Sequence, residues 1–311
     1  NLAFMNYTAL KSVSLPDSLE SIAANSFTGC ASLSEVTFGS GLKSIGTSAF
    51  SGCALTNVAL PDSVETIETQ AFGNIKTLAG ITLSGSLREL AADTFRESIN
   101  LKTIDIPEEN EAFALNGGVL YTKDMKTVVT CPAGMDTASY TIPEGVTKIG
   151  ANAFYKSSIG EIVIPESVAE LEEASLAWLR GNRLVIPENV KLIGNNAVIF
   201  ENPEAKLYVY KDSEAEKYCI DNSLIYSCVP VINDVTAGVV NGKTIIEVDA
   251  ENTESVSVIA VGLTNGSVSA VSDVKRGTAE LNCEADTVKV FCWESFESMY
   301  PLDKAHIVTV E

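Results

Sequence analysis

The chain has 311 residues and a mass of 33.0 kDa, which exceeds one ordinary hydrophobic core and indicates about two domains or one elongated repeat array. It is 46% hydrophobic and 20% charged, and no apolar run approaches the ~18 residues of a membrane span, so we expect a folded chain without a transmembrane segment. The 41 acidic residues outnumber the 21 basic ones, and the net charge of −20 argues against nucleic acid and membrane insertion.

The small number of reactive residues excludes most classes of catalytic site that depend on histidine or on paired cysteines. His306 is the only histidine, so a Ser-His-Asp triad, a Cys-His dyad or a multi-histidine metal site would have to be built around it. The seven cysteines form no CxxC and no His-Cys cluster. We therefore predict no enzyme activity, no cofactor and no metal site, and we expect His306 to lie at the surface or edge of a last strand.

A repeat of 22 or 23 residues fills the first two thirds of the chain. Its marker is a phenylalanine, at Phe4, Phe27, Phe50, Phe72 and Phe95. After an interruption, the segments IPEGVTKIGANAF, IPESVAELEEASL and IPENVKLIGNNAV follow one another at 22 residues between positions 142 and 198. This periodicity predicts eight to nine coils of a solenoid.

Each repeat has the pattern of one solenoid coil. It opens with a short alternating stretch such as LTNVALP (55–61), which predicts a strand of about four residues ended by proline. The following stretch, such as SVETIETQAF (63–72), spaces apolar residues three and five apart, which predicts a tight helical or 3-10 turn. Stacked coils would then form one parallel sheet over a ladder of aliphatic and phenylalanine side chains.

The pattern LxxVxLPxSLxxIxxxAFxGCxxL, read at 10–33 and with changes at 55–78, resembles the BspA-type leucine-rich repeat. The resemblance covers residues 1–228. It implies a curved, right-handed leucine-rich repeat solenoid on a secreted or surface-attached bacterial protein that works by adhesion or protein binding. The strings NGGVLYTKDMKTVVTCP and KLYVYKDSEAEKYCIDNSLIYSCV are similar to a recurrent insertion and to the closing unit of this family.

Residues 108–136 interrupt the repeat. There GGVLYT and KTVVTC flank a turn at Lys123, Asp124 and Met125, which predicts a β-hairpin insertion. We favour a structural element here over a dedicated binding arm. Residues 206–228 are expected to cap the open end with a strand and a short helix. Because the sequence starts at the AF position of a coil, we expect further repeats or a cap upstream.

From residue 229 the period vanishes and alternating β sequence follows. Asn241-Gly242 and Asn265-Gly266 predict tight hairpin turns. Six or seven strands within 229–311 predict a small all-β sandwich of immunoglobulin or fibronectin type III size, although no Cys-Trp-Cys signature supports true immunoglobulin ancestry. The string VKVFCWESFESMYPL is similar to the end of small β-domains in secreted Gram-positive proteins.

The face of the solenoid sheet is the best candidate for a binding site. Residues on either side of the central aliphatic residue of each strand point away from the core. Early coils place small polar residues there, whereas late coils give an apolar file with charged edges, which is typical of a protein-binding patch. The candidate residues are Glu161, Val163, Arg183, Val185, Lys206 and Tyr208. The alternative is that β-branched residues simply suit a strand.

Two other sets of residues have a functional and a structural interpretation. Cys30 and Cys53 occupy one position on successive coils, at a spacing that a disulfide permits, but we favour free thiols in the core. Two acidic clusters invite a glycosidase or calcium interpretation, and we favour solvated surface charge. The clusters are Glu108, Glu109 and Glu111, and Glu170, Glu172 and Glu173.

These features together predict a non-catalytic, extracellular bacterial surface protein that binds a protein of a host or neighbouring cell. Carbohydrate is a second ligand class. A structural stalk or envelope-layer component without a dedicated ligand is the main alternative, and an enzyme with carboxylates on the solenoid is the third.

Overall fold

The computed structural model describes residues 3–251, 257–275, 277–293 and 306–310. Two compact units are present, Asn1–Leu207 with Lys217–Ser223, and Tyr208–Glu216 with Leu224–Glu311. The first unit is a β-solenoid of parallel strands, and the second is dominated by antiparallel sheets. The predicted division of the chain at residue 228 stays a prediction.

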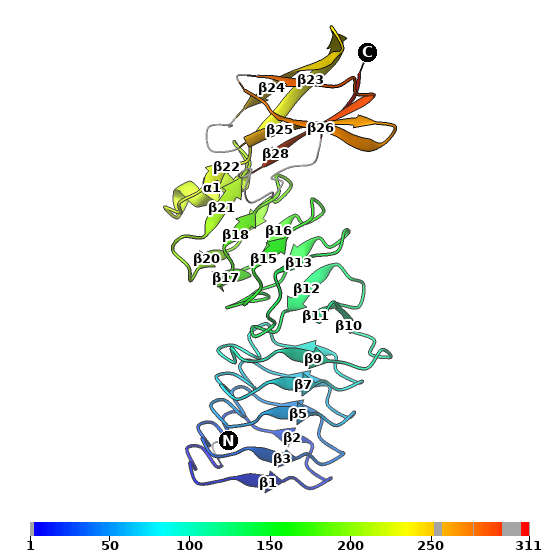
Figure 1. Cartoon of the computed structure of the whole chain (residues 1–311). Coiled ribbons are helices and arrows are strands. Elements are labelled where there is room, and N and C mark those ends of the chain that lie inside the picture. The colour runs from blue at the N-terminus through cyan, green and yellow to red at the C-terminus, as the bar shows by residue number, and fades with distance from the viewer. Residues whose placement is uncertain (1–2, 252–256, 276, 294–305, 311) are drawn as a thin grey trace. The chain divides into compact units, whose positions relative to one another are not determined.

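Each coil contributes a three- or four-residue strand to a parallel ladder, and the strands lie one above another (Figure 1). The register keeps equivalent residues aligned, so that Val58 pairs with Ile81 and Ile81 with Ile104. These central residues are buried, as the alternation of the strand predicts. The strands are β1 (Ser12–Ser14), β3 (Glu35–Thr37), β5 (Asn57–Ala59), β7 (Gly80–Thr82), β9 (Thr103–Asp105), β13 (Ser139–Thr141), β15 (Glu161–Val163), β18 (Arg183–Val185) and β21 (Lys206–Val209). Backbone pairing divides this ladder into β1-β3, β5-β7-β9 and β13-β15-β18-β21.

A second ladder of two-residue strands occupies the place where helical or 3-10 turns were predicted, and that prediction is wrong. The isoleucine five residues before each phenylalanine pairs with the next coil, as Ile45 does with Ile67. The strands are β2 (Ser21–Ile22), β4 (Ser44–Ile45), β6 (Thr66–Ile67), β8 (Glu89–Leu90), β14 (Lys148–Ile149), β16 (Glu170–Leu171) and β19 (Leu192–Ile193). Late coils add a third pair, β17 (Leu176–Leu179) and β20 (Val198–Phe200).

Left-handed residues explain why no helix forms in these turns. In most coils, the residues two before and two after the marker phenylalanine have positive φ. Around Phe50 they are Ser48, at 55°, and Gly52, at 73°. A left-handed residue cannot continue a right-handed helix, so the chain forms separate tight turns, each closed by a hydrogen bond between residues three apart, such as Cys53 N–H to Phe50 O at 3.2 Å.

The marker phenylalanines form the predicted ladder in the core. Phe27 and Phe50 stack with ring centroids 5.3 Å apart and planes at 3°, and Phe50 and Phe72 stack at 5.5 Å. All three rings are almost fully buried. Offset aromatic pairs add roughly 0.5–1.5 kcal/mol each beyond the burial of their area, so the coils stabilise one another through this column.

The interruption is a three-stranded antiparallel meander that separates two stacks of coils. It comprises β10 (Phe113–Asn116), β11 (Val119–Thr122) and β12 (Thr127–Thr130), and β11 and β12 form the expected hairpin. β12 then pairs in parallel with β14, so the second ladder begins again at β12 and continues into the later coils. Its Tyr121 is fully buried, and the Tyr121 and Tyr140 hydroxyls are 2.6 Å apart. Neither ladder runs unbroken across this point.

The last strand of the solenoid is followed by the helix α1 (Glu214–Asp221) and by β22 (Ser227–Cys228), which pairs with β21. Ser213 caps the helix, since its hydroxyl accepts from the Glu216 amide at 3.1 Å, and the Glu216 carboxylate accepts in turn from the Asp212 amide at 2.7 Å. The sequence S-E-A-E therefore fixes where this helix begins.

The second unit contains two antiparallel sheets that share one hydrophobic core. One sheet has the order β23-β24-β27 and the other β26-β25-β28-β29. Both Asn-Gly dipeptides occupy two-residue hairpin loops with positive φ at both positions, as predicted. His306 begins the edge strand β29, and its side chain lies outside the described part. The strands are β23 (Val231–Val240), β24 (Lys243–Glu251), β25 (Ser257–Thr264), β26 (Ser267–Asp273), β27 (Thr278–Leu281), β28 (Thr287–Trp293) and β29 (His306–Thr309).

Candidate functional site

Strands β15 and β18 bring two of the predicted residues side by side. Glu161 and Arg183 are register partners, and a guanidinium nitrogen of Arg183 donates to the Glu161 carboxylate. Only 10% of the Arg183 side chain is exposed. The two charges therefore form a cross-strand link and do not project separately into solvent.

The neighbouring column of the same face carries the apolar residues. Val163 is 40% exposed, whereas Val185 is partly buried. Lys206, the first residue of β21, is exposed and is the outward residue of the last strand on this face. We call the residues that remain on this face the late sheet patch: Glu161, Val163, Arg183, Val185 and Lys206.

Tyr208 does not belong to the late sheet patch, and its prediction as an exposed residue is wrong. It is 4% exposed and is grouped with the second unit, where it pairs with Ser227 of β22. Leu207, Tyr208 and Val209 are all buried, and consecutive buried residues indicate a strand that is covered on both faces. The alternation rule fails here because the strand lies where the solenoid closes. Removing this ring would open a core and would not delete a binding contact.

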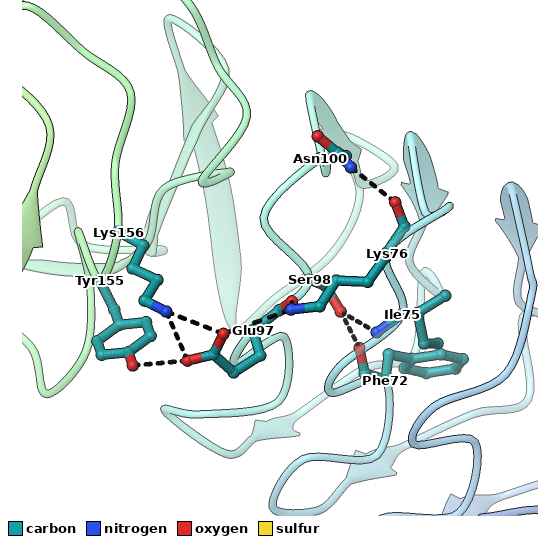
Figure 2. A network of polar contacts seen from close by, with 8 residues as sticks. All are labelled: Phe72, Ile75, Lys76, Glu97, Ser98, Asn100, Tyr155 and Lys156. Carbon is teal, nitrogen blue, oxygen red and sulfur yellow. Dashed lines mark hydrogen bonds and ion pairs between the residues drawn. The ribbon is translucent and has the colours of Figure 1, made fainter. Parts of the chain in front are cut away.

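A second polar cluster joins the two stacks of coils, and the sequence did not reveal it. Glu97 accepts from Lys156 Nζ through both carboxylate oxygens at 2.9 Å and from the Tyr155 hydroxyl at 2.9 Å (Figure 2). Lys76 Nζ lies 3.4 Å from the same carboxylate, and the Arg96 guanidinium lies 4.5 Å from the centre of the Tyr155 ring. We call Lys76, Arg96, Glu97, Tyr155 and Lys156 the junction cluster.

The Glu97 carboxylate is fully paired within the junction cluster. The hydrogen bond from Lys156 is the largest influence on Glu97, and it lowers the pKa of this carboxyl from 4.5 to about 2 although burial acts in the opposite direction. Burial raises the pKa of Tyr155, which keeps its hydroxyl protonated as a donor. A carboxylate held in this way is a structural anion and a poor general base at neutral pH.

The pocket beside the junction cluster is small. Its volume is about 20 Å³, which is room for about one water molecule. Polar residues in its lining include Asp93, Arg96, Asn152 and Lys156. A space of this size does not admit an organic ligand, so the junction cluster connects coils and does not form a binding pocket.

Trp178 is a further residue that the sequence interpretation missed. It occupies the position two residues after the coil marker, where the backbone is left-handed, and its φ is 59°. Other coils place Asn6, Gly29, Gly52 and Asn74 there. A tryptophan in this conformation is costly, and its side chain is 44% exposed. Aligning the coils on their glycine and asparagine positions would have marked Trp178, Glu97 and Lys156 as unusual.

The remaining candidates have structural surroundings. Cys30 and Cys53 are free thiols that lie within 3.2 Å of carbonyl oxygens of the preceding coils, and burial raises the pKa of Cys53 to about 12. Glu170 and Glu172 both pair with Lys148, at 3.1 Å and 3.0 Å. Within the described ranges, no group of three or more His, Cys, Asp or Glu side chains could hold a metal ion. No helix in that part of the chain combines the length and hydrophobicity needed to span a membrane.

The fold and its repeat define a leucine-rich repeat solenoid. The chain belongs to the family described as the BspA type leucine-rich repeat region, whose profile matches residues 1–116 and 133–229 in six copies. The unmatched residues 117–132 contain β11 and β12 of the meander, which supports their status as an insertion. This membership suggests a role in protein interaction. Comparison with curated proteins gives no match.

Solved structures with the same architecture are distant in sequence. A leucine-rich repeat protein from Eubacterium ventriosum superposes with a TM-score of 0.56 at 22% identity, covering 65% of this chain and 61% of that protein. The chain thus spans less than two thirds of that relative, and the likeness shows the fold alone. The pneumococcal vaccine antigen PcpA gives 0.44 at 20% identity, covering 70% and 78% of the two chains. A leucine-rich cell surface protein from Faecalibacterium prausnitzii gives 0.43 at 21% identity, covering 72% and 80%.

Proposed function

We propose that the chain is a non-catalytic, extracellular bacterial surface protein, secreted or surface-attached, whose solenoid binds a protein of a host or neighbouring cell. The observation that carries the proposal is the exposure of Val163 beside the paired Glu161 and Arg183. An aliphatic side chain next to charges that already neutralise each other can be covered by a partner without leaving an unpaired buried charge.

The early coils lack this combination of residues. Their outward positions on β1, β3, β5 and β9 carry serine, threonine, asparagine, glutamate, aspartate and one alanine. We therefore propose that the recognition surface lies on the late coils, next to the end of the solenoid. Membership of a leucine-rich repeat family supports an interaction role for such a surface.

The alternative is a stalk or envelope-layer component without a dedicated ligand. The backbone ladders within each stack and the paired Glu97 carboxylate of the junction cluster would serve such a role equally well. In both cases we propose that the second unit forms a small sandwich of immunoglobulin or fibronectin type III size that acts as a spacer or docking module.

Binding of the full chain to an immobilised panel of extracellular matrix proteins and glycans separates these functions. We expect binding to at least one protein, and we expect Val163→Asp to weaken it roughly tenfold or more. The matched control is Thr141→Asp, which changes an exposed residue paired with Val163 on the preceding coil and should have little effect.

Each other result has a definite meaning. Silence across the whole panel would favour the stalk. Protein binding that Val163→Asp leaves intact would refute the late sheet patch as the recognition surface. Binding to glycans alone would replace the protein partner with a carbohydrate.

A further inference from the structure

The second ladder of the coils before the meander ends at β8, and the far edge of this strand has no backbone partner. Earlier strands of the ladder bond to the next coil, as when Ile45 O accepts from Glu68 N at 3.0 Å. The equivalent groups of β8 are the carbonyl of Arg88 and the N–H and carbonyl of Leu90. Within the described ranges, no protein group is hydrogen-bonded to any of these three.

The meander explains why this edge is unpaired. Counted from Pro107, Ala112 and Phe113 occupy the place of the two-residue strand in the next coil. Their N–H groups both donate to Asn110 Oδ1, at 2.9 Å and 2.8 Å. The carbonyl of Ala112 accepts from Lys123 N at 2.8 Å, on the side of β11. The segment that would pair with β8 therefore uses its backbone groups within the meander.

A groove of about 490 Å³ lies beside this edge, and its volume falls in the range of ligand sites. Glu89, Leu90 and Ala91 line it on the β8 side, and Phe113 lines it from the meander. Threonines of the two preceding coils contribute to the rest of the lining. The groove therefore gives an extended chain access to the edge. We call Arg88, Glu89, Leu90 and Phe113 the β8 edge site.

The solenoid itself contains a template for what pairs with such an edge. β16 carries the same Glu-Leu dipeptide as β8, and its register partner β14 carries Lys148 and Ile149. Lys148 Nζ lies 3.1 Å from the Glu170 carboxylate. Neighbours on either side of a parallel strand lie at the same ~4.8 Å spacing, so a lysine on a strand added to β8 would reach Glu89 in the same way.

The charge of the groove favours a basic occupant. Glu89 is exposed and takes part in no ion pair in the part of the chain that the structure describes. The lining contains a second acidic residue, Glu68, and one basic residue, Arg88. The net charge of the whole chain is −20, which also attracts a positively charged segment.

We propose that the β8 edge site binds an extended segment of a partner protein as an added parallel strand. The segment carries lysine or arginine beside Glu89, followed by an apolar residue beside Leu90. Its basic residue donates its N–H to Arg88 O and accepts from Leu90 N through its carbonyl, and the residue two positions later donates to Leu90 O. Backbone hydrogen bonds supply the affinity and the basic side chain supplies the specificity.

This site is separate from the late sheet patch. β8 belongs to the second ladder before the meander, whereas β15 and β18 belong to the first ladder after it. The proposal therefore does not depend on the recognition surface proposed above. Val163→Asp, which tests that surface, should leave binding at the β8 edge site unchanged.

The test is fluorescence anisotropy of a labelled synthetic peptide titrated with the full chain. The probe has the sequence of residues 144–150, Glu-Gly-Val-Thr-Lys-Ile-Gly, which contains the Lys-Ile of β14. We expect saturable binding with a Kd of roughly 0.1–1 mM. Glu89→Lys should weaken it at least about fivefold, and a probe with glutamate in place of its lysine should recover binding to that variant to within about threefold.

The matched control is Glu35→Lys, which makes the same charge change at an exposed residue of β3 and should have little effect. N-methylation tests the backbone bonds. A methyl group on the lysine amide of the probe removes the donor to Arg88 O and should abolish binding. A methyl group on the isoleucine amide, which points away from β8, should change the Kd by less than about threefold.

Three results would overturn the proposal. The first is a probe that does not bind at several millimolar chain, and the second is binding that Glu89→Lys leaves intact. The third is an equal effect of the two methyl groups, which would show that the probe does not pair with β8 as an added parallel strand.

Discussion

Replacing Glu97 by glutamine tests whether the junction cluster holds the two stacks of coils together. Glutamine keeps the size and the acceptor oxygen but removes the negative charge that Lys156 and Lys76 share. The pKa of Glu97 falls from 4.5 to about 2 in the folded chain. At about 1.4 kcal/mol per pKa unit this shift corresponds to roughly 3 kcal/mol, and screening of a side chain that is 34% exposed reduces it to about 1–2 kcal/mol.

The sign of the pH dependence follows from the direction of this shift. The folded state lowers the pKa of Glu97, so its contribution to the free energy of unfolding is complete above about pH 5 and is lost as the pH falls from 4.5 towards 2. Urea unfolding at a series of pH values should therefore show Glu97→Gln less stable than the wild type at pH 7. The two proteins should converge at the acidic end.

Glu20→Gln is the matched control, because Glu20 pairs with Lys43 at 3.1 Å but is 69% exposed. It should change the free energy of unfolding by less than about 0.5 kcal/mol at any pH. A difference between wild type and Glu97→Gln that stays constant from neutral to acidic pH would show that the charge of Glu97 does not contribute as described.

Three further predictions concern stability and reactivity. Phe50→Ala should lower the free energy of unfolding by about 3–5 kcal/mol, because it removes a buried ring stacked on both sides, whereas Phe4→Ala at the exposed end of the column should cost far less; denaturant midpoints check both. Trp178→Gly should raise the free energy of unfolding by roughly 1 kcal/mol, because it relieves a strained left-handed residue, and a higher thermal midpoint would show this; Trp178→Ala keeps the strain and should give no such gain. Burial raises the pKa of Cys53 to about 12, so its thiol should resist alkylation in the folded chain at pH 8 and react only in denaturant, and rapid native-state labelling of Cys53 would contradict the buried assignment.

The sequence predicts those parts of the fold that repeat at a constant spacing. Local patterns within each coil or turn predict the phenylalanine column, the strands with a buried central residue and the Asn-Gly hairpins. The helical turns were wrong because apolar spacing does not report backbone handedness. The glycine and asparagine residues at the left-handed positions carry that information.

The same local patterns could not predict the contacts that depend on the insertion. Tyr155 and Lys156 lie 58 and 59 residues from Glu97, whereas ordinary neighbours between coils lie 22 or 23 apart. No periodicity indicates which coils become adjacent when a meander replaces a turn. The prediction for Tyr208 fails for a related reason, since strand alternation assumes one open face, whereas the last strand is buried on both faces from Leu207 to Val209.

The meander also has a mechanical consequence. Within each stack, at least one backbone ladder pairs the strands of neighbouring coils, but both ladders are interrupted at the meander, between β8 and β14 and between β9 and β13. Side-chain contacts such as those of Glu97, Arg96 and Tyr155 carry a larger share of the load at this point. A chain pulled along the axis of its solenoid should therefore separate first between the two stacks, and each stack could then extend as its own segment. The insertion thus divides the solenoid into two mechanical segments in series. The side-chain contacts of Glu97 that join them should weaken in acid, as this carboxylate becomes protonated.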